Sequence, residues 1–184
     1  MRRKNNASPD YKYCSIVRDI AVIGLLFASG MRISELCILK QNNIDLKNRT
    51  VLIYGKGSKE HIVQIGNDDV LKSISTYIDN FRSELDNTDY LFVNRLKERL
   101  SEQSVRNMIN KYVDLAGIQM HITPHMFRHS FATLLLEADV DIRYIQNMLG
   151  HSSINTTQIY TSISTHKQKE IFESRHSRNG MKVK

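Results

Sequence analysis

Strand-like patterns in this chain of 184 residues are confined to residues 43–65, and helical spacing dominates the rest. Turn signals at Lys47–Arg49 and Gly55–Ser58 divide that stretch into short apolar segments: residues 44–46, 51–54 and 61–65. Strands joined by turns this short pair in the antiparallel sense. The sequence therefore predicts a mainly α fold with a small antiparallel three-stranded β-sheet (α+β).

The spacing of apolar residues predicts a series of helices around this sheet. Their expected ranges are residues 11–29, 32–39, 68–85, 101–116, 123–138, 142–149, 155–160 and, near the end, 166–172. Gly30 is placed to end the first helix. One side of that helix is apolar and consists of Ile16, Ile20, Ile23 and Phe27. The polar tail after residue 172 is not expected to be structured.

The helix at residues 123–138 has a recognisable start. Thr123 is suited to cap it, and Pro124 fits the first helical position, where its missing N–H costs nothing. His125 and Arg128 are three residues apart and share one face of the helix. Its buried side is expected to be apolar and to consist of Phe127, Phe131, Leu134 and Leu135.

The composition is that of a globular domain, with 41% hydrophobic residues and enough length for one continuous core. The longest apolar run, Ile20–Ala28, is far shorter than the roughly 20 residues of a membrane span, so it predicts a buried helix. The basic residues at the start are followed by a polar stretch instead of the apolar region of a signal peptide. We therefore expect a cytoplasmic protein without membrane contact.

Neither a metal nor a cofactor is expected. Cys14 and Cys37 have no metal-ligand spacing and suggest no disulfide framework, so both are expected to be reduced core thiols. His125 and His129 are four apart on a helix, as in zinc proteases. Met126, however, occupies the position where that motif needs its catalytic glutamate. We expect His129 to be a structural, hydrogen-bonding residue.

The net charge of +7 lies mostly at the two ends of the chain. Residues 1–10 carry three basic and one acidic side chain, and residues 166–184 carry six basic and two acidic ones. The body between them is close to neutral, so charge alone indicates a nucleic-acid partner only weakly. We expect three segments, a basic linker at 1–10, a domain at 11–165 and a basic tail at 166–184.

Four runs of sequence indicate a function more specifically than the charge does. They are Ser29–Leu36, the turn Gly55–Gly57, Thr123–Thr133 and Leu149–Thr161. In this order they resemble the motifs of the tyrosine recombinase (phage integrase) family, and the likeness extends from Tyr11 to Ser164. The resemblance implies the integrase catalytic-domain fold. It also implies site-specific DNA recombination, by integration, excision or inversion, through a covalent 3′-phosphotyrosine intermediate.

The resemblance also implies a set of catalytic residues: Arg32, Glu35, Lys56, His125, Arg128, His151 and Tyr160. Arginine suits the scissile phosphate because its planar fork matches phosphate geometry and stays charged. Tyr160 would be the nucleophile, and its unperturbed pKa of about 10 means that it needs a base and electrophilic help. Glu35 would orient neighbouring groups by hydrogen bonding.

The remaining members of the set would move protons or contact phosphate. The resemblance makes Lys56 the general acid for the departing 5′-oxygen, with Lys59 as the alternative. His125 would assist proton transfer at the tyrosine, and His151 would donate to the phosphate. His61 stands where many relatives have arginine, so the hairpin departs from the family's pattern there.

The implied partner is double-stranded DNA that contains a specific recombination site. The family acts as a homotetramer in the DNA synapse, so we expect a free monomer, four assembled protomers and accessory DNA-bending proteins. The tail near Thr165–Phe172 is expected to dock on a neighbouring protomer. The family's N-terminal DNA-binding domain is absent, so the chain is either a catalytic fragment or a short recombinase. Alternatives are a type IB topoisomerase and a non-catalytic DNA-binding regulator.

Overall fold

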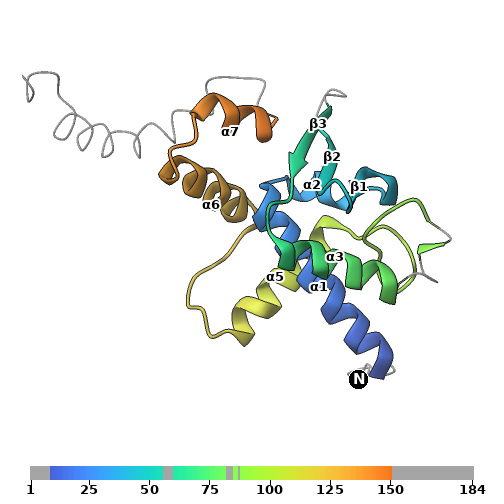
Figure 1. The fold of residues 1–184 in the computed structure, drawn as a ribbon. Coiled ribbons are helices and arrows are strands. Elements are labelled where there is room, and N and C mark those ends of the chain that lie inside the picture. The colour runs from blue at the N-terminus through green and yellow to red at the C-terminus, as the bar shows by residue number, and fades with distance from the viewer. Residues whose placement is uncertain (1–8, 56–59, 82–84, 87, 151–184) are drawn as a thin grey trace, which may run out of the picture.

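The structure is a computed structural model that describes residues 9–55, 60–81, 85–86 and 88–150 (Figure 1). Its helices are α1 (Pro9–Ser29), α2 (Ile33–Cys37), α3 (Asp68–Asn80), α5 (Glu102–Leu115), α6 (Pro124–Glu137), α7 (Ile142–Met148) and a 3-10 turn, η1 (Gln41–Asn43). Its strands are β1 (Ile44–Asp45), β2 (Thr50–Tyr54) and β3 (Glu60–Gln64). The helices expected at residues 155–160 and 166–172 lie outside the described residues.

The predicted sheet is confirmed. Its strand order is β1-β2-β3, and both neighbouring pairs are antiparallel. Val51 pairs with Ile44 on one side and with Val63 on the other, which puts apolar residues on the inward face. The mainly helical fold with a small antiparallel sheet therefore follows from the change of periodicity at residues 43–65.

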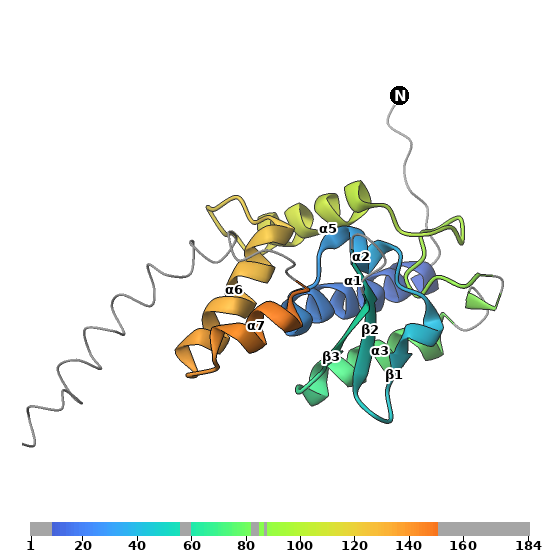
Figure 2. The same cartoon turned by 90° about the horizontal axis from the view of Figure 1, so that it is seen from above.

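Helix α1 is the central element. Seen from above, it runs between α5 on one side and α3 with the sheet on the other, and α6 and α7 lie beside its C-terminal end (Figure 2). Arg18 and Asp19 bond this helix to its neighbours. Arg18 donates to the carbonyl of Val93 at 3.1 Å, and Tyr112 of α5 donates to Asp19 at 3.1 Å. The helices that carry the candidate site are thus attached to one core.

The exposed side of α1 differs from the sequence-based expectation of a buried helix. Ile16, Ile20 and Phe27 of the apolar side are 38%, 54% and 47% exposed. The buried residues are on the other side and include Val17, Ala21, Val22, Leu25 and Leu26. The helix is apolar nearly all round, so its periodicity could not determine which side faces the core.

The buried side of α6 was predicted in part. Phe127, Phe131 and Leu135 are partly buried and pack against the core, but Leu134 is 50% exposed. The most buried residues of the helix are instead Arg128 and Ala132, at 4% and 0% exposed. Pro124 does occupy the first turn, but the Thr123 side chain makes no capping hydrogen bond. A buried arginine is rare unless it is paired, so hydrophobic spacing could not reveal this face.

Gly30 ends α1, as predicted, and its backbone has φ +61°. A Cβ atom at this position would lie 2.6 Å from Phe131 of α6 and 2.9 Å from Leu149 at the end of α7. Both the left-handed backbone and the close packing require glycine here. The turn between α1 and α2 is therefore pressed against the last two described helices.

Helix α3 is shorter than expected and ends at Asn80. Of the two cysteines, which are free thiols, Cys37 is 4% exposed. Burial raises the pKa of Cys37 to about 11, and the nearby Glu102 carboxylate adds to this effect. Cys14 is only half-buried. Of the helices in the described ranges, none has the length and apolar character of a membrane span.

Candidate active site

Arg32 stands directly before α2 and is held there by Glu35. The Arg32 backbone N–H donates to Oε2 of Glu35, and its guanidinium donates to Oε1, both at 2.7 Å. The Glu35 side chain is 5% exposed, whereas that of Arg32 is 38% exposed. A carboxylate that accepts two hydrogen bonds from one residue restricts that residue's orientation. Glu35 thus positions a guanidinium that still reaches solvent.

Arg128 is buried and joins two distant turns. Its Nη1 donates to the carbonyl of Gly30 at 2.8 Å, and its Nη2 donates to the carbonyl of Leu149 at 2.6 Å. The first carbonyl belongs to the α1–α2 turn and the second to the end of α7. Buried carbonyl groups need such partners, because an unsatisfied acceptor is costly. Arg128 therefore holds together the elements that surround the site.

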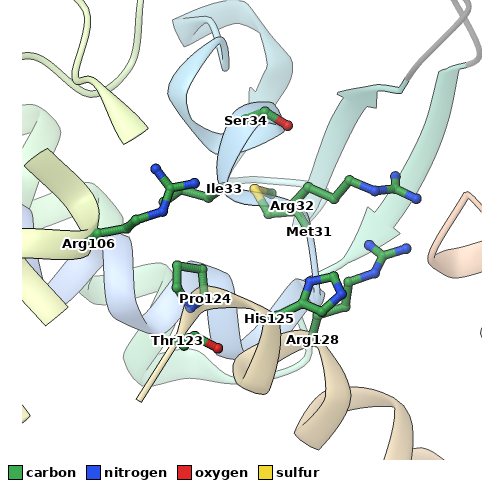
Figure 3. Close-up of a pocket in the computed structure, with 9 residues that line it drawn as sticks. All are labelled: Met31, Arg32, Ile33, Ser34, Arg106, Thr123, Pro124, His125 and Arg128. Carbon is green, nitrogen blue, oxygen red and sulfur yellow. The ribbon is translucent and has the colours of Figure 1, made fainter. Parts of the chain in front are cut away.

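A cavity of about 300 Å³ lies between α2, α5 and the start of α6. Its lining residues are Met31, Arg32, Ile33, Ser34, Arg106, Thr123, Pro124, His125 and Arg128. Figure 3 shows that Arg32 and Arg128 extend in the same direction, toward the side where the β-strands lie. The His125 ring lies next to Arg128. The arrangement can hold an anion between two guanidinium groups beside a histidine.

Four of the predicted site residues lie in the described part of the chain, and the structure brings them together. They are Arg32 and Glu35 beside α2, and His125 and Arg128 on α6, two pairs that are far apart in the sequence. Lys56, Lys59, His151 and Tyr160 lie outside the described residues. His129 is exposed on α6. Within the described part of the chain, no group of three or more His, Cys, Asp or Glu side chains is placed to hold a metal ion.

Two residues near the site were not predicted to belong to it. Arg106 lines the cavity from α5, on the side away from Arg128 (Figure 3). Arg106 forms an ion pair with Glu102 at 2.8 Å. In the sequence these two residues, four apart, look like an ordinary ion pair on a helix surface. His61 of β3 lies against the end of α7. The sequence signal for this residue was that many relatives have arginine at its position.

The charges of the site act on His61. Burial is the largest cause of the lowered pKa of this histidine. The guanidinium groups of Arg128 and Arg32 lower that pKa further, and the Glu35 carboxylate opposes them. The neutral imidazole is therefore favoured beside the two arginines.

A family model described as the phage integrase family matches residues 4–167. The chain belongs to the phage integrase family. This finding confirms the resemblance that the sequence motifs indicated and agrees with the observed fold.

Individual members of the phage integrase family are similar over most of the chain. A tyrosine recombinase from Agathobacter rectalis is 53% identical, with 96% of this chain and 58% of the relative covered. Tyrosine recombinase XerD from Staphylococcus aureus is 41% identical, with 93% and 59% covered. The chain thus spans about three fifths of the length of these curated relatives.

Solved recombinase structures have the same architecture. The XerA recombinase matches with a TM-score of 0.75 and 32% identity, covering 97% of this chain and 67% of that one. XerH, solved with its difH substrate in a pre-cleavage complex, matches with a TM-score of 0.72 and 30% identity, covering 85% and 44%. Both similarities extend beyond the motifs to the whole domain.

Arg128→Lys tests whether Arg128 holds the site together. A lysine cannot reproduce the planar fork that reaches both carbonyls, so one buried acceptor loses its partner. We expect the free energy of unfolding, measured by urea denaturation, to fall by about 1–3 kcal/mol. Arg32→Lys, at a more exposed ion pair, should cost less than about 1 kcal/mol. Equal losses in the two variants would contradict the structural role of Arg128.

Proposed function

We propose that this chain cleaves and rejoins DNA at specific sites through a covalent 3′-phosphotyrosine intermediate on Tyr160. The observation that carries the proposal is the pair of guanidinium groups, Arg32 and Arg128, that extend from one cavity in the same direction beside His125. The relatives named tyrosine recombinases support it. We place this activity in the cytoplasm, and it requires neither a metal nor a cofactor.

The two arginines would act on the scissile phosphate. When a nucleophile attacks phosphorus, negative charge accumulates on the two non-bridging oxygens. Donors that are already oriented stabilise this charge without the cost of reorganisation, and Glu35 and the buried carbonyls orient these two guanidinium groups. His151 would add a further donor to the same phosphate.

Tyr160 would supply the nucleophile. Its phenolic oxygen bonds to phosphorus, the bond from phosphorus to the 5′-oxygen breaks, and the 3′-phosphate stays on the tyrosine. His125 would assist removal of the phenolic proton, since a histidine titrates near neutral pH. The energy of the broken bond is retained in the phosphotyrosine, so rejoining by a 5′-hydroxyl needs no ATP.

Lys56 would donate the proton that the departing 5′-oxygen needs, and Lys59 is the alternative donor. Both lie in the sequence between β2 and β3. This step balances the reaction, because one proton leaves the tyrosine and another reaches the 5′-hydroxyl.

The DNA partner and the assembly follow from the same proposal. The XerH structures contain the difH substrate of that recombinase, which supports DNA as the partner here. We propose that four protomers assemble on two duplexes, with accessory DNA-bending proteins, and that the chain alone is a monomer. The near-neutral body implies weak DNA affinity for this chain by itself.

Tyr160→Phe tests the nucleophile. We expect wild type to form a denaturant-resistant protein–DNA adduct on a nicked substrate that traps the cleaved strand, and Tyr160→Phe to form none. Denaturing gel electrophoresis measures the adduct, and a gel-shift assay on the same DNA confirms that the variant still binds. An adduct of equal yield in the variant would rule out Tyr160.

A sulfur-substituted substrate identifies the general acid. When sulfur replaces the bridging 5′-oxygen, the leaving group no longer needs a proton, because a thiol has a pKa of about 8.5, far below that of an alcohol. We expect Lys56→Ala to slow cleavage of the oxygen substrate by about 100-fold or more and to cleave the sulfur substrate nearly normally. Lys59→Ala is the matched variant, and the same pattern there instead would transfer the role to Lys59.

Truncation tests the role of the tail in assembly. We propose that the segment near Thr165–Phe172 docks on a neighbouring protomer. A chain that ends at Ser164 should therefore still form the adduct on a single site but lose strand exchange between two sites. Unchanged strand exchange in the truncated chain would refute this docking.

A further inference from the structure

His61 is a polar residue on the inward face of the sheet that the proposed chemistry does not use. It pairs with Ile53, which is 1% exposed, and lies two residues before Val63, which is 2% exposed. Cross-strand partners, and residues two apart on one strand, point to the same face of a sheet. The imidazole therefore points inward, and Glu60 and Ile62 beside it are exposed.

The ring of His61 rests on the backbone of Gly150. A Cβ atom added to Gly150 would lie 2.9 Å from Cε1 and 3.1 Å from Nδ1 of that ring. Gly150 also has φ +63°, a left-handed conformation that favours glycine. Its N–H donates to the carbonyl of Asn147 at 3.0 Å and closes the end of α7. Position 150 is thus restricted twice, by its backbone angle and by the histidine ring.

The turn at the end of α7 is held from two sides. Arg128 of α6 donates to the carbonyl of Leu149, and His61 of β3 covers the next residue, Gly150. His151, which follows directly in the sequence, begins the segment that contains Tyr160. A helix and a strand therefore fix the point from which this catalytic segment starts.

The charge state of His61 suits a packing role. Its lowered pKa favours the neutral ring, and a neutral ring does not repel the guanidinium groups of Arg32 and Arg128. Helix α2 contributes the opposing carboxylate, Glu35. The imidazole can thus lie beside two cations that are needed for the phosphate.

We propose that His61 is a positioning residue of this active site. Its ring, packed against Gly150, holds the end of α7 in place relative to Arg128, which donates to the neighbouring Leu149. The inference rests on the proposed function, since it concerns the same site.

A double-mutant cycle of His61→Ala and Gly150→Ala tests this contact, read as the single-turnover rate of adduct formation at saturating DNA. Gly150→Ala strains the backbone and pushes a methyl group into the ring, so we expect a loss on the order of 100-fold. With His61→Ala the methyl group has room, and the same substitution should cost about tenfold less. His61→Ala alone should lower the rate about tenfold without changing the half-saturating DNA concentration.

Gly117→Ala is the matched control for backbone strain. Gly117 has φ +67°, and a Cβ atom there would meet nothing within 4 Å. We expect it to lower the free energy of unfolding but to leave the rate of adduct formation unchanged. Urea denaturation of every variant separates a rate effect from a loss of folded protein.

Additive losses in the cycle would overturn the inference. A wild-type rate in His61→Ala, or a loss that appears only as weaker DNA binding, would also overturn it. If folded wild-type protein forms no adduct at Tyr160, the proposed function fails and the role of His61 fails with it. An adduct in wild type together with additive losses would remove only the role of His61.

Discussion

The buried guanidinium of Arg128 is the interaction on which the candidate site depends. It donates to the carbonyl of Gly30 at the end of α1 and to that of Leu149 at the end of α7. Close packing at Gly30 adds a steric restriction to these hydrogen bonds. A side chain at this position would meet Phe131 and Leu149. One side chain therefore joins the first and the last described helices of the domain and lies next to the cavity.

The groups proposed for the chemistry also hold this domain together. Glu35 both starts α2, by accepting from the backbone of Arg32, and holds the guanidinium of that arginine. The carbonyls of Gly30 and Leu149 orient the Arg128 guanidinium, and Arg128 supplies the hydrogen-bond donors that these buried carbonyls need. Groups held in place before the substrate arrives lower the cost of charge development in the reaction. The arginines that line the cavity are therefore oriented by hydrogen bonds within the protein itself.

The sequence was sufficient for the class of fold, but not for which helical residues are buried. The strand-like segments were predicted correctly, because short turns are local signals. The motif residues Arg32, His125 and Arg128 do line one cavity. The sequence could not show which apolar residues of α1 and α6 are exposed, because Phe27 and Leu134 are as apolar as core residues. Only tertiary contacts distinguish such residues.

Contacts between distant segments were the other feature that the sequence could not give. Gly150 could be recognised as a helix-ending glycine, but the ring of His61 above it depends on where the sheet meets α7. Arg106 looked like half of a surface ion pair, and only the packing of α5 against α2 brings it to the cavity. Such residues extend the site beyond its motifs.

We propose that Arg32 and Arg128 act by neutralising charge on the scissile phosphate. The most direct measurement is the single-turnover cleavage rate of Arg32→Ala on two duplexes, one with a normal scissile phosphate and one with an uncharged methylphosphonate. We expect a loss of about 100-fold or more on the phosphate and a much smaller one on the methylphosphonate, which carries one negative charge less in the transition state. Equal losses on the two substrates would contradict the account.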